Sequence, residues 1–226
     1  MTNIIADIAG NYKTLLALLG QMPDGEIIGL GDLIDRGPRS KEVVDFFMDP
    51  ANNARCVLGN HEHMMLETCR DTGHYSGFDW VYNGGDATIK AYETDGVSVD
   101  YLNAMLHYDL IPASVLNWVA SLPLYIEIGD TLLSHSFMYY DTLEQCCNLD
   151  VSAFDSNFTI IWNREEPTRS EKHKLQIAGH NSQFGEKRFE DGQGLFALCL
   201  DDCRIGKQLT GLHLETMEVF KQDYID

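Results

Sequence analysis

Basic residues are scarce in this chain of 226 residues, which has 16 lysines and arginines against 35 aspartates and glutamates. The formal net charge of −19 produces a long-range field that repels polyanions. We therefore expect no nucleic acid polymer as a partner, although a local basic pocket could still hold a small anion. The acidity itself is sufficiently explained by solubility.

The chain also lacks a cysteine framework and a long hydrophobic run. Its six cysteines show no repeated CxxC pair or regular spacing, which argues against a structural zinc site and against a disulfide scaffold. The apolar runs are too short to span a bilayer, and the N-terminus has no basic segment followed by an apolar stretch. We expect reduced thiols, no membrane partner and a cytoplasmic location.

Short apolar runs rich in isoleucine, leucine and valine alternate with segments of helical periodicity. This pattern predicts an α/β fold in which helices cover a sheet. With 44% hydrophobic residues, the chain is long enough for one domain with a sizeable core, and we expect a single domain over residues 1–226. Strands are expected at 3–6, 26–30, 55–58, 131–134, 175–178 and 195–200, and helices at 12–19 and 41–48.

Polar residues follow directly after the first five apolar runs. They are Asp7, Gly31-Asp32, Gly59-Asn60-His61, His135 and Gly179-His180, and the three glycines are expected to let the backbone turn sharply there. Strand ends that share one edge of an open α/β sheet form the ligand crevice, so we expect these side chains to meet at one edge of the sheet. Carboxylates, imidazoles and amide oxygens are the ligands that divalent metal ions use in proteins. The pattern therefore predicts a metal site.

Residues 73–108 differ from the rest of the chain in being rich in aromatic side chains. The segment contains Tyr75, Phe78, Trp80 and Tyr82, followed by Asn-Gly-Gly at 83–85. We predict an insertion or lid beside the crevice. A packing role for these aromatic residues is at least as well supported as contact with a substrate.

Two sequence motifs carry a resemblance to a known family. Residues 31–37 read Gly-Asp-Leu-Ile-Asp-Arg-Gly and residues 59–62 read Gly-Asn-His-Glu, in this order. With these motifs the chain resembles the calcineurin-like metallophosphoesterases, within them the bacterial and phage-type Ser/Thr protein phosphatases and the symmetrical diadenosine tetraphosphate hydrolases. Residues 80–92, 161–164 and 178–180 add weaker matches. The resemblance implies an α/β sandwich, with central β-sheets flanked by helices and a small aromatic-rich insertion.

The resemblance implies a centre of two divalent metal ions. Manganese is the expected ion, and iron, zinc and magnesium are alternatives. Asp32 would bridge both ions and Asp7 would bind the first. Asn60, His135 and His180 would complete the second site. Two ions about 3.5–4 Å apart can generate a nucleophilic water and neutralise the charge of a phosphoryl group.

The resemblance also implies roles for residues around the phosphate. His61 would be the general acid that protonates the leaving oxygen, and Asp35 would orient it. Arg36 and Arg164 would bind the phosphate oxygens, because a planar guanidinium can bind two oxygens at once.

The family's first motif, Asp-x-His-Gly, is broken in this chain. Here it reads Asp7-Ile8-Ala9-Gly10, and alanine cannot coordinate a metal. We expect a weakened first site and an intact second one. An engineered substitution and natural divergence both explain Ala9, and the completeness of the other ligands favours the first.

Two further acidic residues receive no metal role from the sequence. Glu62 is expected to support its loop through hydrogen bonds. Asp201, in the acidic stretch 201–202, is expected to lie in a solvated turn.

Three functions remain open from the sequence. The first is hydrolysis of phosphate monoesters on proteins or peptides by a Ser/Thr-type protein phosphatase weakened by Ala9. The second is hydrolysis of a dinucleoside polyphosphate, in which the aromatic insertion would stack a base. The third is binding of phosphorylated ligands without catalysis.

Overall fold

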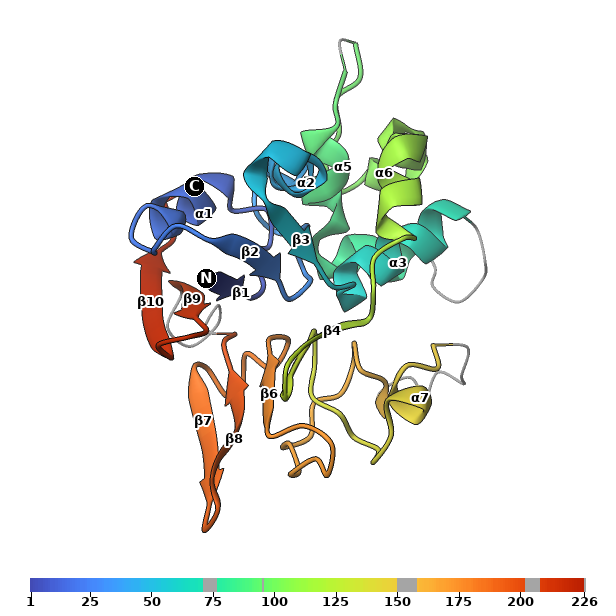
Figure 1. The fold of residues 1–226 in the computed structure, drawn as a ribbon. Coiled ribbons are helices and arrows are strands. Elements are labelled where there is room, and N and C mark those ends of the chain that lie inside the picture. Colours follow the sequence, from blue (N-terminus) through green and yellow to red (C-terminus); the bar gives the residue numbers. More distant parts are fainter. Residues whose placement is uncertain (71–76, 95, 150–157, 202–207, 226) are drawn as a thin grey trace.

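Two β-sheets form the centre of the molecule in the computed structural model, which describes residues 1–70, 77–94, 96–149, 158–201 and 208–225 (Figure 1). The first sheet has the order β10-β9-β1-β2-β3 and the second β4-β5-β6-β8-β7. The first comprises β1 (Thr2–Ile5), β2 (Glu26–Gly29), β3 (Ala54–Cys56), β9 (Gln208–His213) and β10 (Glu218–Asp223). The second comprises β4 (Tyr125–Ile128), β5 (Thr131–Ser134), β6 (Leu175–Ala178), β7 (Lys187–Asp191) and β8 (Gly194–Cys199).

Each sheet has three neighbouring parallel strands. In the first sheet β1, β2 and β3 are parallel, whereas β9 and β10 pair antiparallel. In the second sheet β5, β6 and β8 are parallel, and β4 and β7 are antiparallel edge strands. The carboxyl ends of three strands therefore lie along one edge of each sheet.

The two sheets pack face to face through a shared apolar core. Ile4 and Ile28 of the first sheet belong to the same buried cluster as Leu133 and Ile177 of the second. Neighbouring Ile5 points to the opposite face of its sheet and belongs to another cluster. This is the alternation expected along a strand, and it makes the fold a sandwich.

Helices cover the outer face of the first sheet. The leucines of α1 at positions 15 and 18 and the valines of α2 at 43 and 44 are buried in one cluster with Ile5. Four helices complete this layer or lie next to it, and α7 packs near the second sheet. The helices are α1 (Tyr12–Leu19), α2 (Ser40–Met48), α3 (Asn60–Arg70), α4 (Gly77–Trp80), α5 (Asp86–Ala91), α6 (Ala113–Val119) and α7 (Leu143–Cys146). Short 3₁₀ turns are η1 (Pro50–Asn52), η3 (Ala104–Leu106) and η4 (Tyr108–Leu110), and η2 (Val81–Gly85) is a π turn.

The predicted α/β class is confirmed, but the expectation of one sheet edge was wrong. The polar strand ends are divided between two sheets, because β1, β2 and β3 belong to the first sheet whereas β5 and β6 belong to the second. Four strands, β4, β7, β9 and β10, were not predicted. The sequences of β7 and β10, KRFED and EVFKQD, expose charged residues at alternate or successive positions and so lack an apolar run.

The segment predicted as an insertion or lid joins the helical layer where it is described. Residues 77–94 and 96–108 contain α4, η2, α5, η3 and the first residue of η4, whereas 73–76 and 95, which include Tyr75, lie outside the described residues. Trp80 is fully buried in the core. Phe78 and Tyr82 are 57% and 70% exposed. A lid function stays a prediction.

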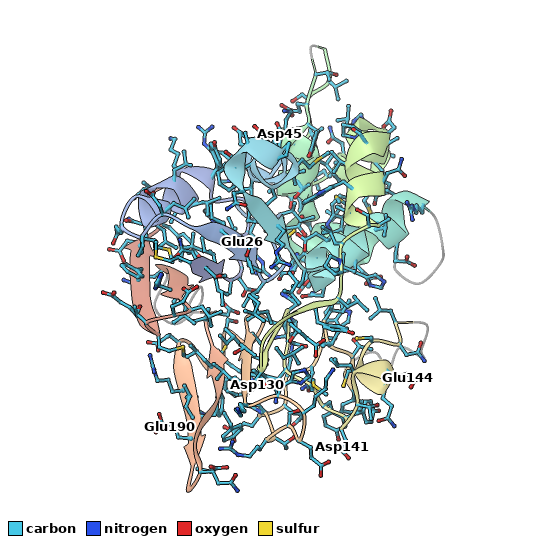
Figure 2. All side chains as sticks on the ribbon, in the orientation of Figure 1. Glu26, Asp45, Asp130, Asp141, Glu144 and Glu190 are labelled. Carbon is cyan, nitrogen blue, oxygen red and sulfur yellow. The ribbon has the colours of Figure 1, made fainter. Side chains whose placement is uncertain are left out.

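The acidic side chains are spread over the molecule. Figure 2 shows Glu26 and Asp45 near the first sheet and its helices, and Asp130, Asp141 and Glu190 around the second. Among the described residues no helix is long and apolar enough to cross a membrane.

Candidate functional site

Six strand ends converge between the two sheets, and five of them carry the predicted metal ligands. Asp7, Asp32 and Asn60 follow β1, β2 and β3, whereas His135 and His180 follow β5 and β6. The sharp exit from the strands places three of these ligands in left-handed backbone conformations, with φ of 50° at Asp7, 50° at Asp32 and 62° at His180. Such strained conformations cluster at functional sites.

Two glycines allow the strand ends to approach one another closely. Gly31 has a φ of +82°, which a residue with a side chain adopts only at a cost. A Cβ atom on Gly179 would lie 2.1 Å from Asp7 Oδ2. The predicted close turns at these two positions are therefore confirmed.

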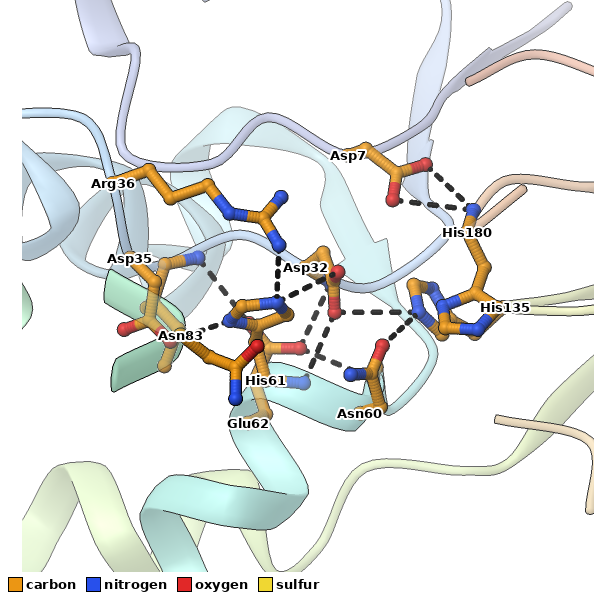
Figure 3. Close-up of polar contacts among 12 residues, drawn as sticks. Asp7, Asp32, Asp35, Arg36, Asn60, His61, Glu62, Asn83, His135 and His180 are labelled. Carbon is orange, nitrogen blue, oxygen red and sulfur yellow. Dashed lines mark hydrogen bonds and ion pairs between the residues drawn. The ribbon is translucent and has the colours of Figure 1, made fainter. Parts of the chain in front are cut away.

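Three predicted ligands form one compact donor cluster. Ligand atoms of Asp32, His135 and His180 lie within 4.8 Å of one another, and all three residues are buried. Asn60 belongs to the same group, because its Oδ1 lies 2.8 Å from His135 Nε2 (Figure 3). Asp32 Oδ1 lies 3.3 Å from the same nitrogen.

The protonation of His135 explains why a cation fits this cluster. Its Nδ1 donates a hydrogen bond of 2.7 Å to the carbonyl of Leu30, which can only accept. Burial lowers the pKa of His135, so the ring is neutral at pH 7 and Nε2 carries a lone pair. That lone pair faces the oxygens of Asn60 and Asp32, so three electron-pair donors converge. Metal-binding histidines typically donate their other N–H to a backbone carbonyl in this way.

His180 is prepared for metal binding by the same means. Its Nε2 donates to the carbonyl of Trp162 at 3.3 Å, which leaves Nδ1 without a proton in the neutral ring. Burial lowers the pKa of His180 well below its usual range, and the nearby His135 and Arg164 lower it further. Both histidines are therefore neutral at physiological pH, the form that binds metals.

Asp32 carries the negative charge of the cluster. Burial by itself would raise the pKa of this carboxyl, but His135, His61 and His180, which are protonated at the low pH where Asp32 titrates, lower it far below its usual range. Asp32 Oδ1 also accepts a hydrogen bond of 3.1 Å from the backbone N–H of His61. The residues of the predicted second site thus fit a divalent ion in donor type and protonation.

The predicted first site is poorer in ligands. Asp7 is 4% exposed and accepts the backbone N–H of His180 at 3.0 and 3.2 Å. Burial raises the pKa of Asp7, and the charges of Asp201 and Asp32 raise it further. Ala9 contributes only backbone bonds, since its N–H donates to the Asp32 carbonyl at 2.8 Å. Of the residues at the positions predicted for the first site, Asp7 and Asp32 can offer ligand atoms and Ala9 cannot.

A buried histidine–aspartate pair lies beside the donor cluster. His61 Nδ1 is 2.6 Å from Asp35 Oδ2, and both side chains are almost completely buried. Trp80 Nε1 donates to Asp35 at 2.9 Å and the Thr88 hydroxyl donates at 2.5 Å, which fixes the carboxylate. Burial disfavours the charged ring of His61, but Asp32 and Asp35 outweigh this and raise its pKa. A histidine of raised pKa that is held by a carboxylate suits proton donation.

Two arginines supply positive charge to the same cavity, which has a volume of about 290 Å³. Arg36 and Arg164 both line it, together with His61 and Asn83. An Arg36 guanidinium nitrogen lies 2.8 Å from His61 Nε2, and because a guanidinium only donates, Nε2 accepts there (Figure 3). Arg164 donates to the carbonyl of His180 at 3.4 Å.

Glu62 has the supporting role that the sequence predicted. One carboxylate oxygen accepts from the backbone N–H of Asp32 at 2.9 Å and of Gly59 at 3.1 Å. The other accepts from Leu33 at 2.8 Å. Glu62 therefore ties the second motif to the third and holds both loops in place.

The expectation for Asp201 was wrong. It is 2% exposed and lines the cavity with Asp7, Asp32 and His180, so it does not lie in a solvated turn. Asp201 follows β8, the strand predicted at 195–200, and the rule applied to the first five strand ends would have found it had it been extended to this sixth one.

Curated relatives match this chain over a short region. The symmetrical bis(5'-nucleosyl)-tetraphosphatase of Salmonella paratyphi A is 44% identical over 69 residues, which is 29% of this chain and 24% of the relative. The enzyme of the same name from Actinobacillus pleuropneumoniae serotype 5b is 39% identical over 71 residues, or 30% and 26% of the two chains. This chain thus spans about a quarter of the length of these relatives.

Solved structures share the fold over nearly the whole chain. A putative diadenosine tetraphosphatase has a TM-score of 0.60 at 18% identity, covering 100% of this chain and 94% of that one. The cold-active protein-tyrosine phosphatase of a psychrophilic Shewanella has a TM-score of 0.64 at 19% identity, covering 94% and 75%. The sequence profile of the family described as calcineurin-like phosphoesterase matches residues 2–204. This chain therefore belongs to the calcineurin-like phosphoesterase family.

Proposed function

We propose that this protein is a metal-dependent phosphoesterase and that its substrates are dinucleoside polyphosphates. One observation carries the hydrolytic part: Asp32 and His180 of the donor cluster line the same cavity as His61 and Arg36. Asp32, His135, His180 and Asn60 would hold a metal ion there, which would supply positive charge to the phosphoryl oxygens and lower the pKa of a bound water. Manganese is the ion we expect, with iron, zinc or magnesium as alternatives.

The chain's own residues act around the phosphate. Arg36, between β2 and α2, and Arg164, between α7 and β6, both line the cavity and would hold the phosphoryl oxygens. His61 would place a proton from Nε2 on the leaving oxygen, while Asp35 keeps its ring oriented through Nδ1. For Nε2 to carry that proton, Arg36 has to leave His61, and a bound phosphate supplies the competing acceptor.

An exposed aromatic pair supports a nucleotide substrate. The rings of Phe78 and Tyr82 stack with centroids 5.9 Å apart and an interplanar angle of 22°. They stand on α4 and η2, directly before Asn83, which lines the cavity. An exposed aromatic face can stack a base, which contributes about 1–3 kcal/mol. The curated relatives named as symmetrical tetraphosphatases point to the same class of substrate.

Two other functions predicted from the sequence use the same groups. A Ser/Thr-type protein phosphatase would need the metal donors, His61 and the arginines, but no aromatic pair to stack a nucleotide base. A binder without catalysis would need only the cavity and its arginines.

The test compares the hydrolysis of two substrates by the unsubstituted protein and by its Ala9→His variant, both with excess manganese. We expect diadenosine tetraphosphate to be cleaved to two molecules of ADP with a higher kcat/KM than a phosphopeptide. Faster hydrolysis of the phosphopeptide would overturn the proposed substrate in favour of a protein phosphatase. Background activity in both proteins on both substrates would overturn the enzymatic proposal and leave the binder.

Variants of Phe78 and Tyr82 test whether this aromatic pair stacks a base. Tyr82→Ala and Phe78→Ala should each raise the KM for diadenosine tetraphosphate about tenfold, as expected from the loss of one stacking contact. Hydrolysis of p-nitrophenyl phosphate, which has no base, should stay unchanged. Tyr101→Ala is the matched control, because Tyr101 is also an exposed tyrosine. An unchanged KM in both variants would contradict base stacking at this position.

A further inference from the structure

We propose that Asp201 is a ligand of the first metal ion and that it takes the place of the histidine missing at position 9. With Asp7 and Asp32 it would form a first site made of oxygen ligands alone. The inference rests on the proposed metal-dependent function and adds a residue to its centre.

The topology of the second sheet brings Asp201 to the site. Strands β5, β6 and β8 are parallel neighbours, and Ala178 of β6 pairs with Cys199 of β8. His180 and Asp201 each lie two residues beyond this pair, and the pairing continues through a 2.8 Å hydrogen bond from Leu200 N–H to the Ala178 carbonyl. Neighbouring strands lie roughly 4.8 Å apart. Asp201 therefore leaves the sheet next to a predicted metal ligand and in the same direction.

Asp201 is buried beside the other two carboxylates of the proposed site. The residue is 2% exposed and lines the cavity together with Asp7 and Asp32, which are each 4% exposed. Three buried carboxylates around one cavity repel one another, and buried charges are stable when they are paired or coordinate a metal. A divalent cation between them relieves this repulsion.

The absence of an imidazole at position 9 determines the character of this site. The methyl group of Ala9 offers no lone pair, whereas Asp7, Asp32 and Asp201 offer carboxylate oxygens. Oxygen ligands suit magnesium and manganese, whereas imidazoles suit zinc and iron. We therefore expect the first site to prefer manganese over zinc, and the second site, which keeps two histidines, to accept both.

Manganese binding to four proteins tests the proposal: the chain as given, Asp201→Asn, Ala9→His and the double variant. Calorimetric titration of the metal-free proteins gives the number and affinity of ions. Low-temperature electron paramagnetic resonance separates a coupled manganese pair from a single ion. Asp130→Asn is the control, because it removes an exposed aspartate that pairs with Lys174.

We expect the unsubstituted protein to bind two manganese ions that form a magnetically coupled pair. Asp201→Asn should weaken manganese binding at the first site at least ~10-fold, because loss of even a group that supports a ligand lowers metal affinity by this factor or more. It should also abolish the signal of the coupled pair. Ala9→His should restore the pair in the double variant, because an imidazole then supplies the missing ligand. It should also shift the first site toward zinc.

Two outcomes would overturn the proposed role of Asp201, and they differ in what they imply for the proposed function. Two ions and an unchanged pair signal in Asp201→Asn would show that Asp201 binds no metal, while the proposed function stands. If the unsubstituted protein binds no manganese, both the metal centre and the proposed function are contradicted. Thermal unfolding in chelator shows whether the asparagine variant folds, and Asp201→Ser, measured in the same way, replaces it if it does not.

Discussion

Replacement of His61 by asparagine should slow hydrolysis to an extent that depends on the leaving group. His61 Nδ1 is bound to Asp35 at 2.6 Å, so Nε2 is the ring nitrogen that faces the cavity, 3.7 Å from Asp32 Oδ2. If Nε2 protonates the leaving oxygen, a strongly basic alkoxide needs this proton and a weakly basic phenolate does not.

The expected magnitude follows from this geometry. General acid catalysis contributes about 10²–10⁴-fold, equivalent to about 2.7–5.5 kcal/mol of transition-state stabilisation. We expect this loss in kcat for an alkyl phosphate monoester. For p-nitrophenyl phosphate the loss should be under about tenfold. The site itself should persist, because Trp80 and Thr88 still hold Asp35 when the imidazole is gone.

The assay measures kcat for both substrates at saturating manganese in the parent protein and the variant. His173→Asn is the matched control: His173 is also buried and also binds a carboxylate, Glu127 at 2.6 Å, but it does not line the cavity. An equal loss for the two substrates in His61→Asn would refute the proton-donor role. It would indicate that His61 only shapes the site.

Three further predictions follow from individual contacts. Arg164→Lys should raise KM for phosphate esters about tenfold with a smaller effect on kcat, because an ammonium cannot bind two oxygens in a fork; steady-state kinetics check this. Trp80→Phe should lower the free energy of unfolding by about 1–3 kcal/mol in urea, because Asp35 loses a buried donor, whereas Trp118→Phe on α6 should cost less. Burial raises the pKa of Cys69 to about 12 and of Cys147 to about 11 from an ordinary 9.0. At pH 8 the thiolate fraction of Cys147 should therefore be about a hundredfold lower than normal, and its alkylation, followed by peptide mass spectrometry, should accelerate as pH rises toward 11 or when the protein is unfolded.

The sequence could predict the local parts of the site because each part is encoded by adjacent residues. A buried strand followed by glycine and a polar residue requires a sharp exit from the sheet, and the stretches around Asp32 and Asn60 satisfy this. The helix at 12–19 was also predictable from its apolar spacing alone. The edge strands β7 and β10 were not, since exposed strands with charged residues carry little periodic signal.

What the sequence determined was the set of chemical groups: carboxylates, imidazoles, an amide and two arginines, and the alanine that interrupts the first motif. The tertiary structure decided how these groups meet. The packing of two sheets sets His135 opposite Asn60, the Leu30 carbonyl selects the tautomer of His135, and strand register places Asp201 beside His180. None of these is a local property, because each depends on which strands become neighbours once the apolar faces of the two sheets are buried against each other.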